Sequence, residues 1–232
     1  MKKIGIIGAM EEEINILKEK MQVEKVEKKA GMEFFQGILS GKNVIIVRSG
    51  IGKVNAAICT QILADDFGVE AVINTGVAGS LRNEINIGDI VLSSDSLQHD
   101  MDATGFGYEL GVIPRMDTSI FKADESMVKM AKKVCEEVNP DIQVFIGRVV
   151  SGDQFISDSE KKQFLIKEFG GYCTEMEGAA IAQAAHLNNI PYLVIRAISD
   201  KADHSAEMDY GEFEAKAIEH TVKLVSELAA SL

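Results

Sequence analysis

The feature that most constrains the fold is the alternation of short β-branched runs with longer stretches of helical period. The first run is "KIGII" at residues 3–7, a helical stretch follows at 10–20, and the next run is "NVIIVRSG" at 43–50. Strands that alternate with helices in this way form a parallel or mixed sheet with helices on its faces. The pattern continues with expected helices at 53–68, 121–138, 158–169, 175–188 and 211–231, and expected strands at 70–80, 88–94, 142–151 and 191–199.

Two segments interrupt this alternation. In residues 23–41 two extended stretches flank Ala30-Gly31, which indicates a β-hairpin and therefore a mixed sheet. Residues 96–120 show no clear periodicity, and a loop of that length in a compact domain is usually functional or lies at an interface. Because no linker or repeat marks a boundary, we expect one domain over residues 1–232, a three-layer α/β sandwich with a central mixed β-sheet flanked by helices.

Charge and cysteine content exclude several classes of partner. The 36 acidic and 24 basic residues give a net charge of −12, which repels nucleic acid and anionic lipid. Cys59, Cys135 and Cys173 lie far apart without a C-x-x-C pair, as in proteins of the reducing cytosol. The apolar run at the N-terminus is too short for a signal peptide. We expect a cytoplasmic protein without a nucleic-acid or membrane partner.

Three glutamates follow the first expected strand, in "GAMEEEINI" at residues 8–16. A glycine turn before a helix start is where many α/β proteins hold a phosphate, yet Glu11, Glu12 and Glu13 occupy it here. They form either a solvated acidic turn or a turn in which one glutamate acts as a base. Helix positions advance by about 100° per residue, so at most one or two face a cleft. A functional glutamate is expected to stay ionised at the helix N-terminus.

Two nucleotide-binding motifs are absent, because the residues do not have the spacing that each motif requires. The segment "SGIGKV" at 49–54 has Val47 and Val54 where a Walker loop requires glycine and Ser or Thr. The glycines of "GIIG" lack the spacing of the dinucleotide fingerprint. The segment "HDMD" at 99–102 offers possible metal ligands, but no other histidine stands at ligand spacing from it. We therefore predict neither cofactor nor metal.

Two further motifs combine small residues with polar ones. In "NTGVAGSL" at 74–81, the glycines make either a tight turn or a close backbone approach to a ligand, which brings in Ala78 and Gly79. In "CTEMEGAAIAQAAHL" at 173–187, Glu175 and Glu177 precede an alanine-rich stretch that indicates close packing. They act as helix caps or as functional carboxylates, and because they stand two apart only one is expected to enter a pocket.

The last expected strand ends in polar residues. In "PYLVIRAISDKAD" at 191–203, Arg196, Ser199 and Asp200 lie at the carboxyl end, where open α/β sheets place their ligand crevice. Asp200 is either a ligand-facing residue or an N-cap or partner of Arg196.

Taken together, several segments closely resemble one known family. They are "IGIIGAMEEEI", "SGIGKVNAA", "INTGVAGSL", "GDIVLSS", "HDMDATGFGYELG", "SGDQFI", "EMEGAAIA" and "VIRAISDKAD", in order along essentially the whole chain. The chain is similar in them to the bacterial 5′-methylthioadenosine/S-adenosylhomocysteine nucleosidases of the purine and uridine phosphorylase superfamily. The resemblance implies a homodimeric hydrolase of methionine salvage that cleaves the N-glycosidic bond of adenine nucleoside thioethers, 5′-deoxyadenosine included, without cofactor or metal.

The resemblance also implies a role for individual residues. Glu13 matches the base that activates water, and Asp200 the acid that protonates purine N7, supported by Ser199 and Arg196. Such an acid must hold its proton near neutral pH, so burial should raise its pKa, whereas Glu13 must stay a carboxylate. The remaining matches are Glu177 at the ribose 2′-hydroxyl, Met176 along the sugar, Phe155 and Ile156 at the adenine, and Met10, Ile51 and Tyr210 near the ribose and its 5′ group.

Part of the implied site comes from a second subunit. Phe106, Tyr108 and Pro114 match residues that family members lend to the 5′ pocket of the neighbouring subunit, which would explain the long loop. One departure is Val77, where relatives often carry a hydroxyl residue. Only backbone contacts remain for that position.

Two alternatives stay open at this point. Phosphorylases of the same superfamily hold their attacking phosphate with arginines, and Arg48 is a residual basic candidate for that role. An inactive nucleoside-binding protein on this fold would lack at least one of Glu13, Glu177 and Asp200, all of which are present. The sequence does not rank the adenine nucleosides, nor does it exclude a related nucleosidase of menaquinone biosynthesis.

Overall fold

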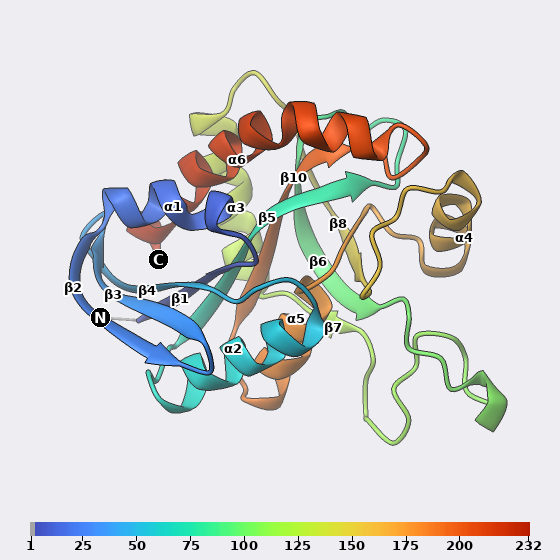
Figure 1. Cartoon of the computed structure of the whole chain (residues 1–232), viewed down its shortest axis with the longest axis horizontal. Helices are drawn as coiled ribbons and strands as arrows, with labels where there is room; N and C mark the ends of the chain where they lie inside the picture. The colour runs from blue at the N-terminus through green and yellow to red at the C-terminus, as the bar shows by residue number, and fades with distance from the viewer. Residues whose placement is uncertain (1–2) are drawn as a thin grey trace.

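A mixed sheet extends through the computed structural model, which describes residues 3–232 apart from the side chains of Glu207 and Glu212 (Figure 1). The strand order is β10-β6-β8-β9-β5-β1-β4-β3-β2, and β10 also pairs with β5, so that β5, β9, β8, β6 and β10 close into a ring. The strands are β1 (Ile4–Gly8), β2 (Gln22–Lys29), β3 (Met32–Leu39), β4 (Lys42–Arg48), β5 (Ala71–Ser80), β6 (Ile90–Gln98), β7 (Phe121–Lys122), β8 (Val144–Ser151), β9 (Cys173–Glu175) and β10 (Tyr192–Asp200).

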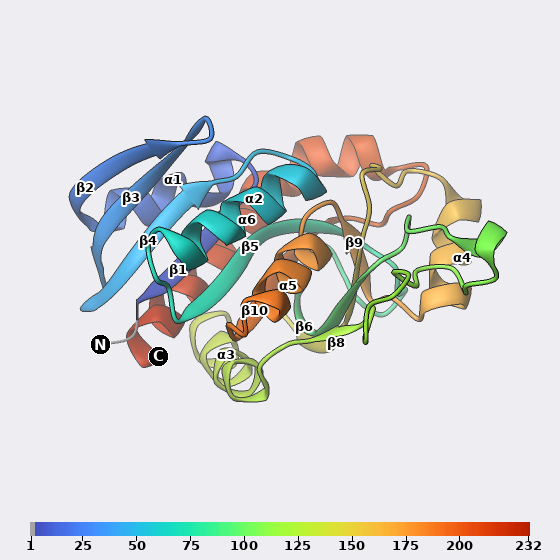
Figure 2. The same ribbon diagram turned by 90° about the horizontal axis from the view of Figure 1, so that it is seen from below.

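Helices cover both faces of this sheet, as the alternation in the sequence predicts (Figures 1 and 2). One face carries α1, α3 and α6, the other carries α2 and α5, and α4 lies at the far end beside the ring of strands. The helices are α1 (Glu11–Lys20), α2 (Lys53–Asp65), α3 (Glu125–Val138), α4 (Ser159–Phe169), α5 (Gly178–Leu187) and α6 (Ala206–Ser231). The predicted fold class is confirmed.

The expected hairpin is present and belongs to a meander. Strand β2 pairs antiparallel with β3 through Lys29 and Met32, and β3 pairs antiparallel with β4. The two turn residues Ala30 and Gly31 have φ angles of 48° and 78°, the left-handed conformation of a two-residue hairpin loop. The sheet is therefore mixed, because β4 in turn runs parallel to β1.

Three predicted helix starts were wrong. Residues Phe121–Lys122 pair with β6, and α3 starts at Glu125 because Asp124 caps it by accepting from the Met127 N–H. Residues Cys173–Glu175 form β9, which delays α5 to Gly178, and α6 begins earlier than expected, at Ala206. For α3 and α5, local periodicity continued through residues that sheet pairing or capping assigns differently.

The parallel strands bring their carboxyl ends to one edge of the sheet. Strand β1 runs parallel to β4 and β5, and β5 runs parallel to β10. Asp200 at the end of β10 pairs with Gly79 of β5, and β1 ends at Gly8, just after Ile7 pairs with Asn74 of the same strand. Strands β1, β5 and β10 are buried along their whole length, as expected for parallel strands covered on both faces. None of the helices that the structure describes is long and apolar enough to cross a bilayer.

Candidate active site

A cavity of about 190 Å³ opens at this edge of the sheet. Its lining includes every residue that the resemblance assigns to the site within one subunit: Met10, Glu13, Ile51, Ala78, Gly79, Phe155, Ile156, Glu175, Met176, Glu177, Arg196, Ser199, Asp200 and Tyr210. Ala9, Gln154 and Thr174 also line it, and sequence reasoning missed them although each adjoins a predicted residue. The structure thus brings segments from across the chain into one concave site.

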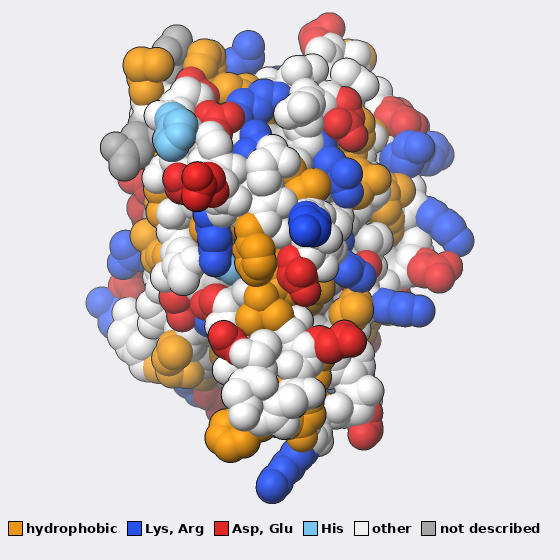
Figure 3. All heavy atoms as spheres, turned by 90° about the vertical axis from the view of Figure 1, so that its right-hand side faces the viewer, with side chains coloured by type: hydrophobic (Ala, Val, Ile, Leu, Met, Phe, Trp, Pro, Cys, Tyr) orange, Lys and Arg blue, Asp and Glu red, His pale blue; other side chains and the backbone are white. Residues whose placement is uncertain are grey.

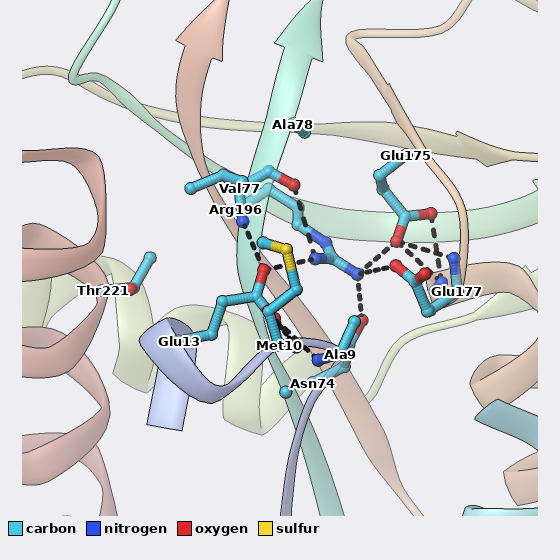
Figure 4. Close-up of polar contacts among 12 residues, drawn as sticks. Ala9, Met10, Glu13, Asn74, Val77, Ala78, Glu175, Glu177, Arg196 and Thr221 are labelled. Atoms are coloured by element: carbon cyan, nitrogen blue, oxygen red, sulfur yellow. Dashed lines mark hydrogen bonds and ion pairs between the residues drawn. The ribbon is translucent and has the colours of Figure 1, made fainter. Parts of the chain in front are cut away.

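Arg196 lies at the centre of the polar part of this cavity, only 1% exposed (Figure 4). Its Nη2 donates to Glu175 and, at 2.6 Å, to Asn74 Oδ1, while Glu177 Oε2 lies 3.6 Å from Nη2 and Glu13 Oε1 lies 3.9 Å from Nη1. Burial opposes the charge, but the carboxylates outweigh it and raise the pKa of Arg196. One guanidinium therefore compensates a cluster of buried glutamates.

Glu13 is placed by the start of α1. It stands at the third helical position and accepts from the backbone N–H groups of Ala9 at 2.6 Å, Met10 at 3.0 Å and Val77 at 3.2 Å. Gly76 makes room for it, because a Cβ there would lie 2.3 Å from Glu13 Oε1. Val77 thus serves the site through its backbone.

A functional glutamate at the helix N-terminus is expected to stay ionised, but in the structure burial acts against the charge of Glu13. Glu13 is 1% exposed, and burial raises its pKa more than Arg196 and the three backbone N–H groups lower it. The sequence pattern placed Glu13 in a first helical turn but did not show how deeply that turn is buried. A raised pKa makes the carboxylate a stronger base.

Glu175 and Glu177 both line the cavity, contrary to the expectation that only one would enter it. Glu175 ends β9 and Glu177 is the N-cap residue of α5, so neither stands within the helix and helical spacing does not separate them. Glu175 accepts from Ser151 Oγ and the Gly178 N–H, whereas Glu177 Oε1 accepts from the Gly52 N–H at 2.8 Å. Burial and the charge of Glu175 raise the pKa of Glu177 to about 7.

Asp200 has a different environment at the end of β10. It is 2% exposed, its Oδ1 accepts from the Ala202 N–H at 2.8 Å, and its Oδ2 accepts from Ser199 Oγ at 2.9 Å. Burial raises its pKa, and these two hydrogen bonds lower it in part. The predicted support from Ser199 is present. Arg196 instead contacts the glutamates, because it precedes Asp200 by four strand residues, roughly 13 Å.

The apolar wall of the cavity comes from three separate segments. Phe155 is 49% exposed and its ring meets that of Tyr210 edge to face at 6.1 Å, while Ile156 beside it is buried. Tyr210 Oη donates to Glu214 Oε1 at 2.7 Å and lies 3.4 Å from Met10 Sδ. These side chains form an apolar part of the cavity lining beside the carboxylates.

Some predicted residues lie outside this cavity. Phe106 and Tyr108 are 88% and 37% exposed on the long loop, where the short 3₁₀ helix η1 (Thr104–Phe106) interrupts the irregular backbone, and Pro114 follows on the same loop. Asp100, part of the possible metal motif, is bonded to Lys53 instead. Among the residues that the structure describes, no three His, Cys, Asp or Glu side chains gather as a metal-binding group.

A cavity at the carboxyl ends of parallel strands, lined by buried carboxylates with raised pKa values and by apolar side chains, has the features of a site at which an α/β enzyme acts on a small, partly apolar molecule. The family profile of the phosphorylase superfamily matches residues 3–230, and the chain belongs to that superfamily.

Known relatives cover the whole chain. The chain is 42% identical over 231 residues to a 5′-methylthioadenosine/S-adenosylhomocysteine nucleosidase of Bacillus cereus, with 99% of each chain covered. A nucleosidase of the same name from Colwellia psychrerythraea, solved in complex with adenine, is 41% identical with a TM-score of 0.95, covering 100% of this chain and 96% of that one. The futalosine hydrolase of Helicobacter pylori is 36% identical with a TM-score of 0.94, covering 100% and 98%.

Proposed function

We propose that this chain is a hydrolase that cleaves the N-glycosidic bond of 5′-methylthioadenosine and S-adenosylhomocysteine, releasing adenine and the corresponding thioribose. The observation that carries the proposal is the pair of buried acids Glu13 and Asp200, which line one cavity with different partners. The names of the full-length relatives support the same substrates. In a cell this reaction would serve methionine salvage and remove the by-product of methyl transfer, in the cytoplasm.

Asp200 is the proposed general acid. Adenine is a poor leaving group until its ring is protonated, and a buried aspartic acid with a raised pKa retains the proton that N7 needs. Its Oδ2 is held by Ser199 and its Oδ1 by the Ala202 N–H, so the carboxyl group is oriented before the substrate binds. Phe155 and Ile156 are the proposed contacts for the adenine ring beside it.

Glu13 is the proposed general base for water. As the bond to adenine breaks, the sugar gains oxocarbenium character and needs a nucleophile on its opposite face. The bonded backbone N–H groups fix the orientation of the Glu13 carboxylate, and its raised pKa makes it a more effective proton acceptor. Acid and base should each contribute a factor on the order of 10²–10⁴ in rate.

Glu177 is the proposed partner of the ribose 2′-hydroxyl. Its Oε1 is held by the Gly52 N–H, and Met176, which precedes it, lines the cavity beside the sugar. A hydrogen bond to the 2′-hydroxyl strengthens as charge develops on the sugar ring. Glu175 does not need to touch the substrate for this purpose, since it anchors both Arg196 and the start of α5.

The cavity disfavours phosphate as the nucleophile. Arg196 is already surrounded by Glu13, Glu175 and Glu177. A phosphate dianion next to Glu13 would meet repulsion of about 4 kcal/mol per pair of charges at about 4 Å and an effective dielectric near 20. Arg48, the remaining basic candidate, is 58% exposed and lies 3.9 Å from Glu11.

Adenine release in phosphate-free buffer tests this proposal directly. We expect release from both thioether nucleosides at a rate that added phosphate does not increase. Strict dependence on phosphate would assign a phosphorylase. Tight binding without product on long incubation would assign an inactive binding protein. A panel that includes 5′-deoxyadenosine and a futalosine-type nucleoside would rank the substrates.

We further propose a homodimer in which the long loop of each subunit closes the 5′ end of the partner's cavity through Phe106, Tyr108 and Pro114. Phe106 and Tyr108 are exposed here, and Figure 3 shows other hydrophobic side chains exposed among charged ones on the face that α4 and this loop share. Ile51, Val54 and Ile58 add an exposed apolar stripe along the start of α2. Sedimentation equilibrium and loss of substrate affinity on Phe106→Ala would test this arrangement.

A further inference from the structure

A cluster of charged residues joins three segments of the chain through side chains that the proposed catalytic chemistry does not use. Lys53 comes from "SGIGKV", Asp100 from "HDMD" and Asp153 from "SGDQFI". None of the three lines the cavity, but Lys53 follows Gly52, whose N–H holds Glu177, and Asp153 precedes Gln154, which lines the cavity. The cluster therefore connects parts of the site that are far apart in sequence.

The contacts within this cluster form a closed cycle. Lys53 Nζ donates to Asp100 Oδ1 at 2.5 Å, the Asp153 N–H donates to Asp100 Oδ2 at 2.9 Å, and the Lys53 N–H donates to Asp153 Oδ1 at 2.9 Å. Lys53 Nζ also donates to Gln98 Oε1 at 2.9 Å. Each bond of the cycle has at least one charged partner and is stronger than a bond between neutral groups.

The cluster is shielded from water. The side chains of Lys53 and Asp100 are 17% and 16% exposed, much less than an ordinary surface ion pair. Although burial acts against it, the ammonium group of Lys53 and the Asp153 N–H lower the pKa of Asp100. A Cβ added at Gly152 would lie 2.4 Å from the buried ring of His99. The backbone at Gly152 therefore packs closely against His99, which follows the end of β6.

Two loops of the cavity depend on these contacts. The residue before Lys53 is Gly52, whose N–H holds Glu177 Oε1 at 2.8 Å, and Ile51 before it lines the cavity. The residues after Asp153 are Gln154, Phe155 and Ile156, and all three line the cavity. Asp100 bonds directly to both loops, so it sets the spacing between the sugar side and the base side of the site.

We propose that Asp100 is a positioning residue that holds the loop 51–53 and the loop 153–156 at a fixed separation across the substrate cavity. It acts through Lys53 and the Asp153 N–H and does not touch the substrate. The inference rests on the proposed nucleosidase function. It assigns Asp100, the second residue of "HDMD", to positioning two binding loops instead of holding a metal.

Asp100→Asn is the test variant, because it keeps the size of the side chain and removes one acceptor. One of the two former acceptor positions then presents an amide NH₂ group to either the Lys53 ammonium or the Asp153 N–H, two donors facing each other. We expect KM for methylthioadenosine to rise roughly tenfold or more, with a smaller change in kcat, as when binding common to ground and transition states is lost. Calorimetry should show a similar loss of affinity for adenine.

A double-mutant cycle with Lys53→Met separates positioning from a general structural role. If both residues act through one cycle of contacts, the double variant should raise KM about as much as either single variant, well below the product of the two effects. The matched control is Asp66→Asn, which breaks the Asp66–Lys29 pair, 2.7 Å apart and more exposed, far from the cavity. It should leave KM and adenine affinity unchanged.

The outcomes are distinct. If wild-type protein releases adenine and Asp100→Asn has the same KM and adenine affinity, the positioning role is overturned. Independent, multiplicative effects of Asp100→Asn and Lys53→Met would also overturn it. A loss of melting temperature without a KM change would make Asp100 a purely structural residue. If wild-type protein released no adenine from any nucleoside, the proposed function itself would fail.

Discussion

The two ends of the cavity contain the same kind of side chain in opposite surroundings. At the β1–β9 end, Glu13, Glu175 and Glu177 share the charge of one buried arginine, Arg196. At the end of β10, Asp200 is held by a serine hydroxyl and one backbone N–H, both uncharged donors. Carboxylates beside a cation are favoured in the ionised form, whereas a buried acid with neutral donors retains its proton more readily.

This contrast offers a physical basis for the proposed roles of Asp200 as acid and Glu13 as base. Burial raises the pKa of Glu13 and of Asp200 alike, so depth alone does not separate their roles. What separates them is the guanidinium of Arg196, which lowers the pKa of Glu13 and pairs with the glutamates, not with Asp200. The difference between the two ends can be removed or strengthened by single substitutions.

The largest effect is expected from Arg196→Met, which removes the only cation within this cluster of described residues. Glu13, Glu175 and Glu177 would stay buried without a counter-charge, so the free energy of unfolding should fall by about 3–5 kcal/mol and activity should be lost. Urea unfolding measures the change. The control is Arg48→Met, an exposed arginine 3.9 Å from Glu11, with an expected change within about 0.5 kcal/mol. Equal stability of both variants would contradict the assignment of Arg196.

Asp200→Asn should lower kcat by about 10³–10⁴, because an amide cannot deliver a proton to N7. The fold should persist, since the amide oxygen can still accept from the Ala202 N–H. Adenine release is the measurement, and Asp65→Asn, an exposed aspartate at the end of α2, is the control. A kcat near that of the wild type would exclude Asp200 as the acid.

Glu13→Gln should lower kcat by about 10²–10³ through loss of the base. Its amide group would also face backbone N–H groups, which adds about 1–3 kcal/mol of destabilisation. The neighbouring Glu12→Gln is the matched control, because Glu12 is exposed in the same helical turn. If the two variants had equal rates, the water-activating role would have to be assigned elsewhere.

The pH dependence of stability tests the surroundings of the glutamates through Glu177. The pKa of Glu177 is raised from 4.5 to about 7, so the folded state binds the extra proton and stability falls as pH rises through that interval. The free energy of unfolding falls by up to about 3 kcal/mol over this interval because of Glu177. Between pH 4.5 and pH 7, the melting temperature should therefore depend less on pH in Glu177→Gln than in the wild type. It should keep the wild-type dependence in Glu24→Gln, which changes an exposed glutamate of β2. If the melting temperature of Glu177→Gln depended on pH as it does in the wild type, Glu177 would not be the cause of the pH dependence.

The smallest effect is expected from Ser199→Ala at the aspartate end. The Ser199 hydroxyl lowers the pKa of Asp200, so its removal should raise that pKa further. Because the proposed acid acts in its protonated form, the fall of kcat/KM with rising pH should move to higher pH. At lower pH, kcat/KM should fall by roughly tenfold or less relative to the wild type. A shift to lower pH would mean that Ser199 does not stabilise the ionised form.

Much of the fold was predictable because hydrophobic periodicity is a local property. The hairpin turn at Ala30-Gly31 and the buried β5 follow from short stretches of sequence. The starts of α3 and α5 were not predictable in the same way. Pairing of Phe121–Lys122 with β6 and of Cys173–Glu175 with β5 and β8 depends on strands distant in sequence.

By itself, the sequence determined the order of the elements, the negative charge and the positions of the acidic residues at strand ends and helix starts. The tertiary structure alone decided which of those acids share Arg196, that Glu175 and Glu177 enter one cavity, and that Asp100 bonds to two of its loops. The physical reason is that periodicity and capping act over a few residues, whereas burial and charge pairing depend on side chains brought together from the whole chain.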